Sequence, residues 1–282
     1  MLSQGLVVSH EQLGNTDQKL RRLVLQGPAA QTAQAGQFVT VQVQDSARAS
    51  FDPLLRRPIS IAEISPERDE ITLLYRIKGR GTEILAQARC GDSLSIMGPL
   101  GNGFSLPEEG ELWLVAGGIG IFPLFALAQR ALSQGLKVRL FWGGECKSFM
   151  ESAGLASWKE LEIKTSLSTL DGSLGEKGLV TEPLHSALTQ IKPADSKPEA
   201  NEVRVSVAAC GPKGMMQSVT ELCQRFDVPI EVSLEERMGC AVGACLGCVC
   251  TLKDKAGRLI HKKVCLDGPI FRGEEVVWNE TC

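Results

Sequence analysis

The chain has 282 residues, of which 43% are apolar, and its formal net charge is −3. This length exceeds what one hydrophobic core usually serves, so we expect two or three domains. The slightly acidic balance, with a pI near 5.8, gives no electrostatic reason to expect nucleic acid or an anionic membrane as a partner. The chain has ten cysteines, and its first residues lack a basic stretch followed by an apolar one. Ten cysteines would suggest disulfides in a small secreted chain, but the length of this chain and the character of its first residues favour the reducing cytoplasm.

Residues 1–106 alternate short apolar runs with turn signals, a pattern typical of an antiparallel β-barrel. We predict strands at 20–25, 37–43, 58–64, 71–77 and 93–97. A stretch rich in glycine and proline at 98–103 ends this pattern, and 107–110 has the composition of a linker.

Two segments of the predicted barrel place arginine beside turn residues. The first reads Arg57-Pro58-Ile59-Ser60, and an arginine at a strand end can pair with a phosphate through two parallel hydrogen bonds. The second runs from Leu74-Tyr75-Arg76 into a turn with Gly81 and Thr82, which we expect to begin a helix with N–H groups suited to phosphate. Each segment alone is equally compatible with a solvated basic strand end. Together they predict a site for a dinucleotide phosphate.

Residues 107–234 change to buried strands that alternate with helical segments, which predicts a doubly wound parallel α/β sheet. We expect strands at 112–116, 138–142, 203–209 and 230–234, and helices at 121–134 and 213–226. The apolar run 112–128 imitates a membrane span, but its glycines and proline favour a buried strand, a turn and a helix. The polar stretch between Ile191 and Glu202 is predicted to be a surface loop.

Two glycine turns follow strands of this predicted sheet. The first contains Gly117, Gly118 and Gly120, and the second contains Cys210 and Gly211. Glycine lets the backbone approach a nucleotide closely, although a tight strand-to-helix turn needs glycine in any case. Two such turns at the carboxyl ends of strands face one crevice, so together they predict a nucleotide site.

The choice between NAD and NADP depends on a different residue. Glu145 follows the second strand of the predicted sheet, and a carboxylate there suits a ribose 2′-hydroxyl and repels a 2′-phosphate. This favours NAD, although the nearby Lys147 weakens the argument.

Residues 235–282 form a small cysteine-rich module. Three cysteines in one glycine-rich loop and a fourth after a longer gap have the plant-type ligand spacing of a two-iron two-sulfur cluster: Cys240, Cys245, Cys248 and Cys265. Structural zinc usually takes two separated ligand pairs, so the spacing favours iron and sulfide. Cys250 has strand-like spacing from Cys248, and we interpret it as a packing residue. Three glycines are expected to provide positive φ angles and N–H groups directed at the sulfurs: Gly239, Gly243 and Gly247.

Taken together, these motifs resemble the ferredoxin-NADP reductase superfamily, in which a flavin-binding barrel precedes a pyridine-nucleotide domain. The resemblance rests on the segment 57–60, the turn at 79–82, the glycine turn 117–120 with Pro123, and Cys210-Gly211-Pro212. The stretches 236–250 and 263–271 narrow it to the electron-transfer subunits of B-type dihydroorotate dehydrogenases. It covers essentially the whole chain.

The resemblance implies three cofactors and a site for each. FAD would be bound by the barrel through Arg57, Pro58, Ile59, Ser60, Leu74, Tyr75, Arg76, Gly81 and Thr82. The cluster would be bound by Cys240, Cys245, Cys248 and Cys265. NAD would bind at the glycine turns as a substrate, with Cys210 either near the nicotinamide or a plain strand-end cysteine. The superfamily commonly has an aromatic residue where Ile59 stands, and no acid or base catalyst is predicted.

The implied function is an electron relay in de novo pyrimidine biosynthesis. A partner catalytic subunit with FMN oxidises dihydroorotate to orotate, and this chain carries the electrons to NAD, in a heterotetramer with two of each subunit. The same module order occurs in flavin and iron-sulfur subunits of NADH-dependent ferredoxin:NADP reductase and of sulfur-reducing hydrogenase. An alternative of another class is a zinc-binding module without redox function.

Overall fold

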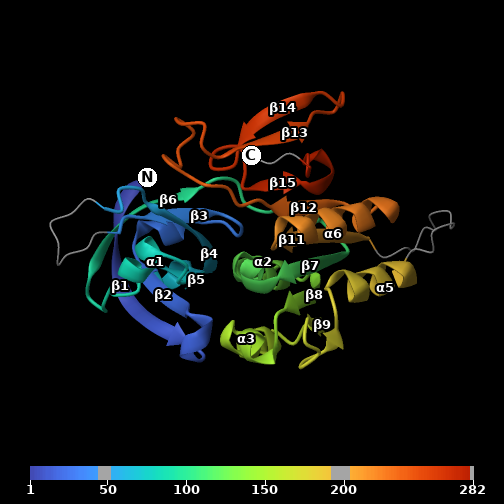
Figure 1. The fold of residues 1–282 in the computed structure, drawn as a ribbon, viewed down its shortest axis with the longest axis horizontal. Helices are drawn as coiled ribbons and strands as arrows, with labels where there is room; N and C mark the ends of the chain where they lie inside the picture. The colour runs from blue at the N-terminus through green and yellow to red at the C-terminus, as the bar shows by residue number, and fades with distance from the viewer. Residues whose placement is uncertain (44–51, 192–203, 280–282) are drawn as a thin grey trace.

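The computed structural model describes residues 1–43, 52–191 and 204–279. The polar stretch expected to be a surface loop lies within 192–203, outside the described residues. Figure 1 shows a barrel on the left, a sheet with helices on the right, and a C-terminal module lying across both.

Six antiparallel strands form a closed barrel in the order β1-β2-β5-β4-β3-β6. The strands are β1 (Leu2–Leu13), β2 (Leu20–Gln26), β3 (Phe38–Val41), β4 (Arg57–Ser65), β5 (Glu70–Arg76) and β6 (Ser93–Leu100). Inward-facing residues such as Leu23, Leu25, Ile71 and Leu73 fill its core. A short helix, α1 (Arg80–Leu85), follows β5. The predicted antiparallel barrel is confirmed, although β1 was not among the predicted strands.

The second sheet has seven strands in the order β10-β9-β8-β7-β11-β12-β15, and all neighbours except β12 and β15 run parallel. Its first six strands in chain order are β7 (Glu111–Gly117), β8 (Lys137–Gly144), β9 (Lys164–Thr169), β10 (Glu176–Lys177), β11 (Val205–Cys210) and β12 (Ile230–Ser233). The helices are α2 (Phe122–Ser133), α3 (Lys147–Ser152), α4 (Leu155–Glu160), α5 (Thr181–Ile191) and α6 (Lys213–Arg225).

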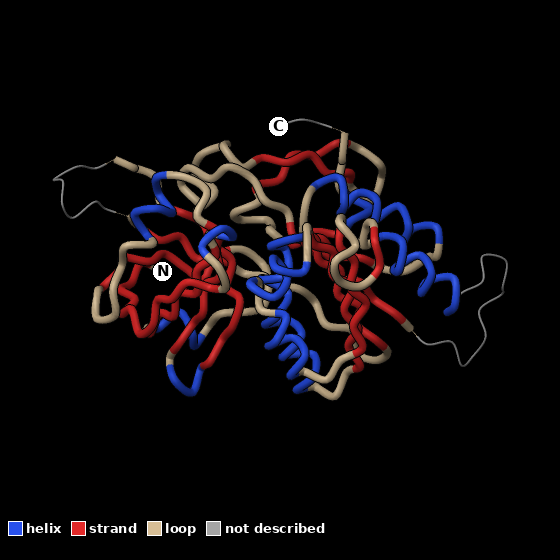
Figure 2. Tube along the Cα trace, turned by 60° about the horizontal axis from the view of Figure 1, so that its bottom comes forward, coloured by secondary structure: helices blue, strands red, loops and turns tan. Residues whose placement is uncertain are grey.

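Helices cover both faces of this sheet (Figure 2). Along β7, Leu112 and Leu114 pack on the side of α2 and α4, whereas Trp113 and Val115 pack on the side of α5 and α6. Burial on both faces explains why the strand is a continuous apolar run. The predicted doubly wound sheet is confirmed.

The apolar run 112–128 is a strand, a 3₁₀ turn at Gly118–Ile121 and the first half of α2, as expected. In the described part of the chain, no helix has both the length and the apolar character needed to cross a membrane. Helix α2 instead packs between the sheet and barrel strand β4 (Figure 1).

The C-terminal module is a hairpin of β13 (Val249–Lys253) and β14 (Leu259–Lys263), followed by β15 (Ile270–Arg272). Strand β15 pairs antiparallel with β12 and so extends the seven-stranded sheet. Just before it, the Gly268 carbonyl oxygen accepts a hydrogen bond of 2.6 Å from the Asn102 N–H of the barrel side. The module is therefore fixed to both larger parts. We propose domain boundaries at 106/107 and 234/235. The second boundary assigns β12 and β15, which pair with each other, to different domains.

Candidate functional site

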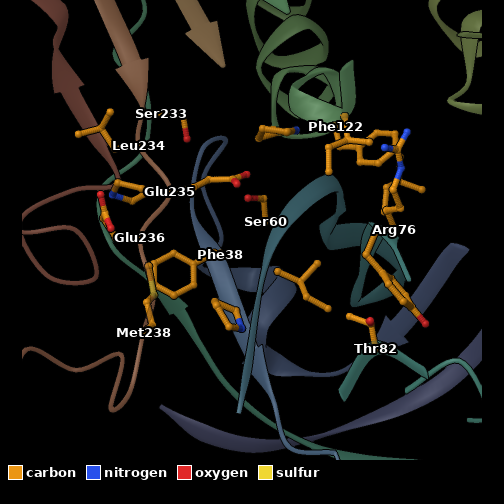
Figure 3. Close-up of a pocket in the computed structure, with 17 residues that line it drawn as sticks. Phe38, Ser60, Arg76, Thr82, Phe122, Ser233, Leu234, Glu235, Glu236 and Met238 are labelled. Atoms are coloured by element: carbon orange, nitrogen blue, oxygen red, sulfur yellow. The ribbon is translucent and has the colours of Figure 1, made fainter. Parts of the chain in front are cut away.

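A cavity of about 250 Å³ lies where the barrel, α2 and the start of the C-terminal module meet (Figure 3). We call it the flavin cavity, after the cofactor expected there. Its barrel wall consists of Phe38, Pro58, Ile59, Ser60, Leu74, Tyr75, Arg76 and Thr82. The opposite wall consists of Ile119, Phe122, Pro123, Ser233, Leu234, Glu235, Glu236, Met238 and Pro269. Strands β4 and β5 are neighbours in the barrel, which is why two segments far apart in sequence share one wall.

Two of the expected flavin residues, Arg57 and Gly81, lie beside the cavity and against each other. A Cβ added to Gly81 would overlap Nε of Arg57, so the guanidinium occupies the space that a side chain at position 81 would fill. The Thr82 hydroxyl accepts hydrogen bonds from the backbone N–H groups of Lys78 (2.9 Å) and Gly79 (3.2 Å). Thr82 thus shapes the turn that presents Gly81 to Arg57, and this charged cradle fits a diphosphate.

The cavity has aromatic side chains at positions that the sequence did not indicate. Ile59 lines the cavity, and so do Phe38 on β3 and Phe122 at the start of α2 (Figure 3). Phe38 pairs with Ser60 across β3 and β4. The cavity therefore offers aromatic groups to a planar ring system despite the aliphatic residue at position 59.

Glu235 is a carboxylic acid of the cavity wall that sequence reasoning missed, and Figure 3 shows its side chain pointing into the cavity. Burial raises the pKa of Glu235, and Lys78 partly opposes this. The thiol of Cys210 is 2% exposed; its pKa is raised by burial first and by Glu235 second, while a hydrogen bond to the Ser233 side chain opposes the rise. Cys210 does not line the cavity itself. Its link to the cavity runs through Ser233.

A second cavity, of about 360 Å³, lies at the carboxyl ends of β7, β8, β9 and β11, and we call it the nucleotide cavity. It is lined by Gly117, Gly118, Gly143, Gly144, Glu145, Leu170, Gly178, Leu179, Val180, Thr181, Pro212, Gly214, Met215 and Ser218. The sequence indicated Gly117 at the end of β7, Gly118 directly after it, and Glu145. It also indicated the second glycine turn, which continues through Pro212 to Gly214 and Met215 at the start of α6, but it missed Ser218 and the residues after β9.

The two predicted glycine turns pack directly against each other beneath the nucleotide cavity. A Cβ on Gly120 would overlap the carbonyl oxygen of Cys210 and lie 2.7 Å from the nitrogen of Gly211. A Cβ on Gly211 would lie 2.9 Å from the nitrogen of Gly117. Gly120, Cys210 and Gly211 thus support the cavity without lining it, and glycine is required there because backbone meets backbone.

One ion pair connects the two cavities. Nη1 of Arg76, from the flavin cavity, lies 3.4 Å from Oε1 of Glu145, from the nucleotide cavity. The Arg76 guanidinium also lies 5.0 Å from the ring centroid of Phe149. The Glu145 side chain is 60% exposed, so the pair contributes little to stability and remains accessible to a ligand.

The four candidate cluster ligands lie close together in the C-terminal module. The Cys245 N–H donates to Sγ of Cys240 at 3.2 Å. Hydrogen bonds from the backbone, first from Cys245 and then from Val242, lower the pKa of Cys240 to about 6. Burial and a hydrogen bond with Cys248 raise the pKa of Cys265 to about 11. Backbone N–H groups directed at a sulfur are what a thiolate ligand of a cluster needs. Cys250 is buried on β13.

The expected roles of the loop glycines were partly wrong. Of the three glycines, only Gly243 has a positive φ, of 76°; in the same loop the non-glycine Ala241 has a φ of 58°. Gly239 and Gly247 instead leave space beside Cys245, since added Cβ atoms would lie 3.3 and 3.6 Å from its Sγ. Within residues 1–43, 52–191 and 204–279, no three His, Cys, Asp or Glu side chains converge as a single metal ion requires. Each iron of a two-iron two-sulfur cluster needs only two thiolates, whereas a structural zinc ion needs four ligands. The four cysteines therefore fit a two-iron cluster better than a zinc ion.

Comparisons with known proteins agree with this arrangement. Residues 235–277 match the family model described as the iron-sulfur cluster binding domain of dihydroorotate dehydrogenase B. The chain is 42% identical over 251 residues to the dihydroorotate dehydrogenase B (NAD(+)) electron transfer subunit of Geobacillus kaustophilus, covering 86% of this chain and 87% of that protein. It is 37% identical over 284 residues to the subunit of the same name from Bacillus cereus, covering 98% and 99%.

Solved structures show the same architecture. The structure of an NADH-dependent reduced ferredoxin-NADP oxidoreductase aligns with a TM-score of 0.79 and 28% identity, over 98% of this chain and 91% of the other. Phthalate dioxygenase reductase aligns with a TM-score of 0.62 at 19% identity, over 94% and 77%. The second similarity supports the fold alone.

A barrel, a doubly wound sheet and a four-cysteine module around two cavities define a ferredoxin-reductase-like oxidoreductase that carries electrons. The chain belongs to the family of electron transfer subunits of dihydroorotate dehydrogenase B (NAD(+)). The predicted family is therefore confirmed. FAD, a two-iron two-sulfur cluster and NAD, the three cofactors expected from the sequence, are confirmed as those of this class.

Proposed function

We propose that the chain passes electrons from the FMN of a dihydroorotate-oxidising catalytic subunit to NAD⁺, through its own cluster and FAD, in pyrimidine biosynthesis. The observation that carries this proposal is the segment 233–238, which lines the flavin cavity and leads directly into Cys240. Met238, in the cavity wall, is two residues from that ligand. The relatives' names supply the substrate and the acceptor.

The chain's residues would hold each group as follows. Arg57 and the turn at Gly81 and Thr82 would bind the FAD diphosphate, while Pro58, Ile59, Ser60 and Leu74–Arg76 would position the ring system. Cys240, Cys245, Cys248 and Cys265 would bind the cluster. Gly117 and Gly118 would let NAD⁺ approach the protein backbone at the end of β7 closely. When bound, the cluster passes single electrons and FAD collects two of them for hydride transfer to NAD⁺.

A small apolar surface beside the cysteine loop supports the choice of partner. Val242, Leu246 and Leu266 are 48%, 73% and 55% exposed, and a Cβ on Gly243 would lie 2.7 Å from Cδ2 of Leu266. Exposed apolar patches of this kind mark interaction sites. We propose that the catalytic subunit docks here, in a complex with two of each subunit. Nine cysteines in the described part of the chain are unbridged, which supports a cytoplasmic location.

Analysis of iron, sulfide and flavin in the purified chain tests the cofactors, with two irons, two sulfides and one FAD expected per chain. Addition of a dihydroorotate-oxidising subunit should then give dihydroorotate:NAD⁺ activity. A colourless zinc protein without flavin would refute the electron-transfer proposal. A coloured protein that is active only with a ferredoxin or hydrogenase partner would refute the choice of partner alone.

A further inference from the structure

The hydroxyl group of Tyr75 is held by a histidine from another strand. Tyr75 is the single tyrosine of the chain, and it lines the flavin cavity from β5 while being 5% exposed. Its hydroxyl oxygen lies 2.9 Å from Nε2 of His10 on β1. Nδ1 of the same ring lies 2.8 Å from the carbonyl oxygen of Ala88, just after α1. His10 therefore joins β5 to the chain that follows α1.

These two contacts define the hydrogen positions on the imidazole. A carbonyl oxygen can only accept, so Nδ1 of His10 donates to Ala88. In the neutral ring Nε2 is then an acceptor, and the Tyr75 hydroxyl donates to it. Burial lowers the pKa of His10, the Ala88 carbonyl opposes this, and the positive charge of Arg21 on β2 lowers it further. The neutral ring is thus the form that suits this site.

An irregularity in β1 places His10 inside the barrel. The register of β1 against β2 shifts between Val7 and Ser9, and a bulge of this kind changes which side chains face inward. Val7 is buried, and strict alternation would turn Ser9 and Glu11 inward with it. The shift turns His10 inward instead. The turn after α1 is fastened to the same place, because Gly91 N–H donates to the Val7 carbonyl oxygen at 2.9 Å.

The chain from Tyr75 to Ala88 is consequently a loop whose two ends are joined by one imidazole. This loop carries Arg76, Gly81 and Thr82, three of the residues expected to bind FAD. Across its base, each end contributes one hydrogen bond to His10.

We propose that His10 is a positioning residue of the flavin site, which fixes Tyr75 in the cavity wall and closes the base of the loop that holds the FAD diphosphate. This inference rests on the proposed FAD site. Loss of the imidazole would leave the buried Tyr75 hydroxyl without its acceptor and the loop open at its base, and an unpaired buried polar group is costly.

Three variants of the full chain test the proposal through FAD affinity, measured by flavin fluorescence. His10→Phe keeps an aromatic ring but removes both hydrogen bonds, and it should raise the FAD dissociation constant about tenfold. His10→Gln retains a donor and an acceptor, and it should restore most of the affinity. His185→Phe is the control, since His185 is exposed on α5 and contacts Phe226 instead; it should change the constant less than about twofold.

A spectroscopic signature separates this role from a general loss of stability. Because Tyr75 is the only tyrosine, a chain labelled with ¹³C at the tyrosine Cζ gives one resonance that reports on this hydroxyl. That resonance should shift as His10 takes up a proton below pH 6.5, and the shift should disappear in His10→Gln. Charged groups of the neighbouring elements, Arg21 on β2 and the Asp92 carboxylate that accepts from the Arg89 N–H, are unchanged in this variant.

The outcomes distinguish the two proposals. An unaltered chain that binds no FAD would overturn the proposed function and this inference with it. If His10→Phe binds FAD as tightly as the unaltered chain does, the role of His10 alone is overturned. The same holds if the tyrosine resonance titrates in His10→Gln as it does in the unaltered chain. If His10→Phe does not fold, His10→Gln and the labelled chain still decide the question.

Discussion

Replacing Gly120 by alanine should push apart the two glycine turns that support the nucleotide cavity. The added Cβ would overlap the Cys210 carbonyl oxygen and lie 2.5 Å from the Cys210 carbonyl carbon. Both are backbone atoms at the end of β11, which is paired on both sides by β7 and β12. Neither can rotate away as a side chain would, so the turn itself must move.

The size of the effect follows from this geometry. Overpacking a well-packed site costs about 1–3 kcal/mol, and a clash with paired backbone belongs at the upper end, about 2–3 kcal/mol. For a unit of 150–250 residues, each kcal/mol lowers Tm by about 2–4 °C. We therefore expect Gly120→Ala to lower Tm by about 4–12 °C, and to weaken NAD⁺ binding at least about fivefold because Gly117 and Gly118 move with the turn.

Gly214→Ala is the matched control, because Gly214 lines the same cavity but has no atom within 4 Å of an added Cβ. It lies in the first turn of α6, where alanine is favoured over glycine by up to about 1 kcal/mol, so Tm should stay equal or rise. Scanning calorimetry and NAD⁺ titration of the three proteins provide the comparison. A Gly120→Ala chain that melts within about 1 °C of the parent and binds NAD⁺ equally well would refute the reasoning.

Four further substitutions test other parts of the site. Cys245→Ser should abolish the visible cluster absorbance and leave FAD bound, whereas Cys250→Ala should keep the cluster; a full cluster spectrum in the serine variant would show that the ligands are misassigned. Glu145→Gln, which removes the negative partner of Arg76, should raise the affinity for NADP⁺ relative to NAD⁺ about fivefold by titration, and an unchanged ratio contradicts a role in ribose recognition. Burial raises the pKa of Glu235 above its ordinary value of 4.5, so the folded chain holds this proton more tightly than the unfolded chain, and stability falls as the pH rises from about 4.5 through the raised pKa. Glu235→Gln removes this loss, and its advantage in Tm over the parent should grow between pH 4 and pH 7; a constant difference would argue against a raised pKa of Glu235.

Local signals were sufficient for much of the fold. The predicted strand at 71–77 is β5, at 70–76, because its apolar run is bounded by turn residues on both sides. The helix expected at 213–226 is α6, at 213–225, since its apolar residues follow a helical period after Pro212. In contrast, β1 escaped prediction. Its bulge breaks the alternation, and Ser9, His10 and Glu11 make its second half polar.

The site was predictable where one segment carries its own chemistry, and not where it depends on long-range pairing. Cys240 and Cys245 are recognisable from spacing alone. Nothing local indicates that Phe38 and Glu235 share a cavity, because one lies on a barrel strand and the other follows β12. Nor does the sequence show that β15 joins the second sheet, since three residues are too few to carry a pairing signal.

The pairing of β15 with β12 has a mechanical consequence. Electron carriers on flexible tethers move between donor and acceptor, and their turnover slows as the viscosity of the solvent rises. Here the segment that directly follows Cys265 is held by the main sheet through β15 and by the Asn102 side chain, which donates to the Asp267 carbonyl oxygen. A cluster bound by the four cysteines would therefore keep a fixed distance from a flavin in the flavin cavity, and no diffusive search would be needed for transfer within the chain.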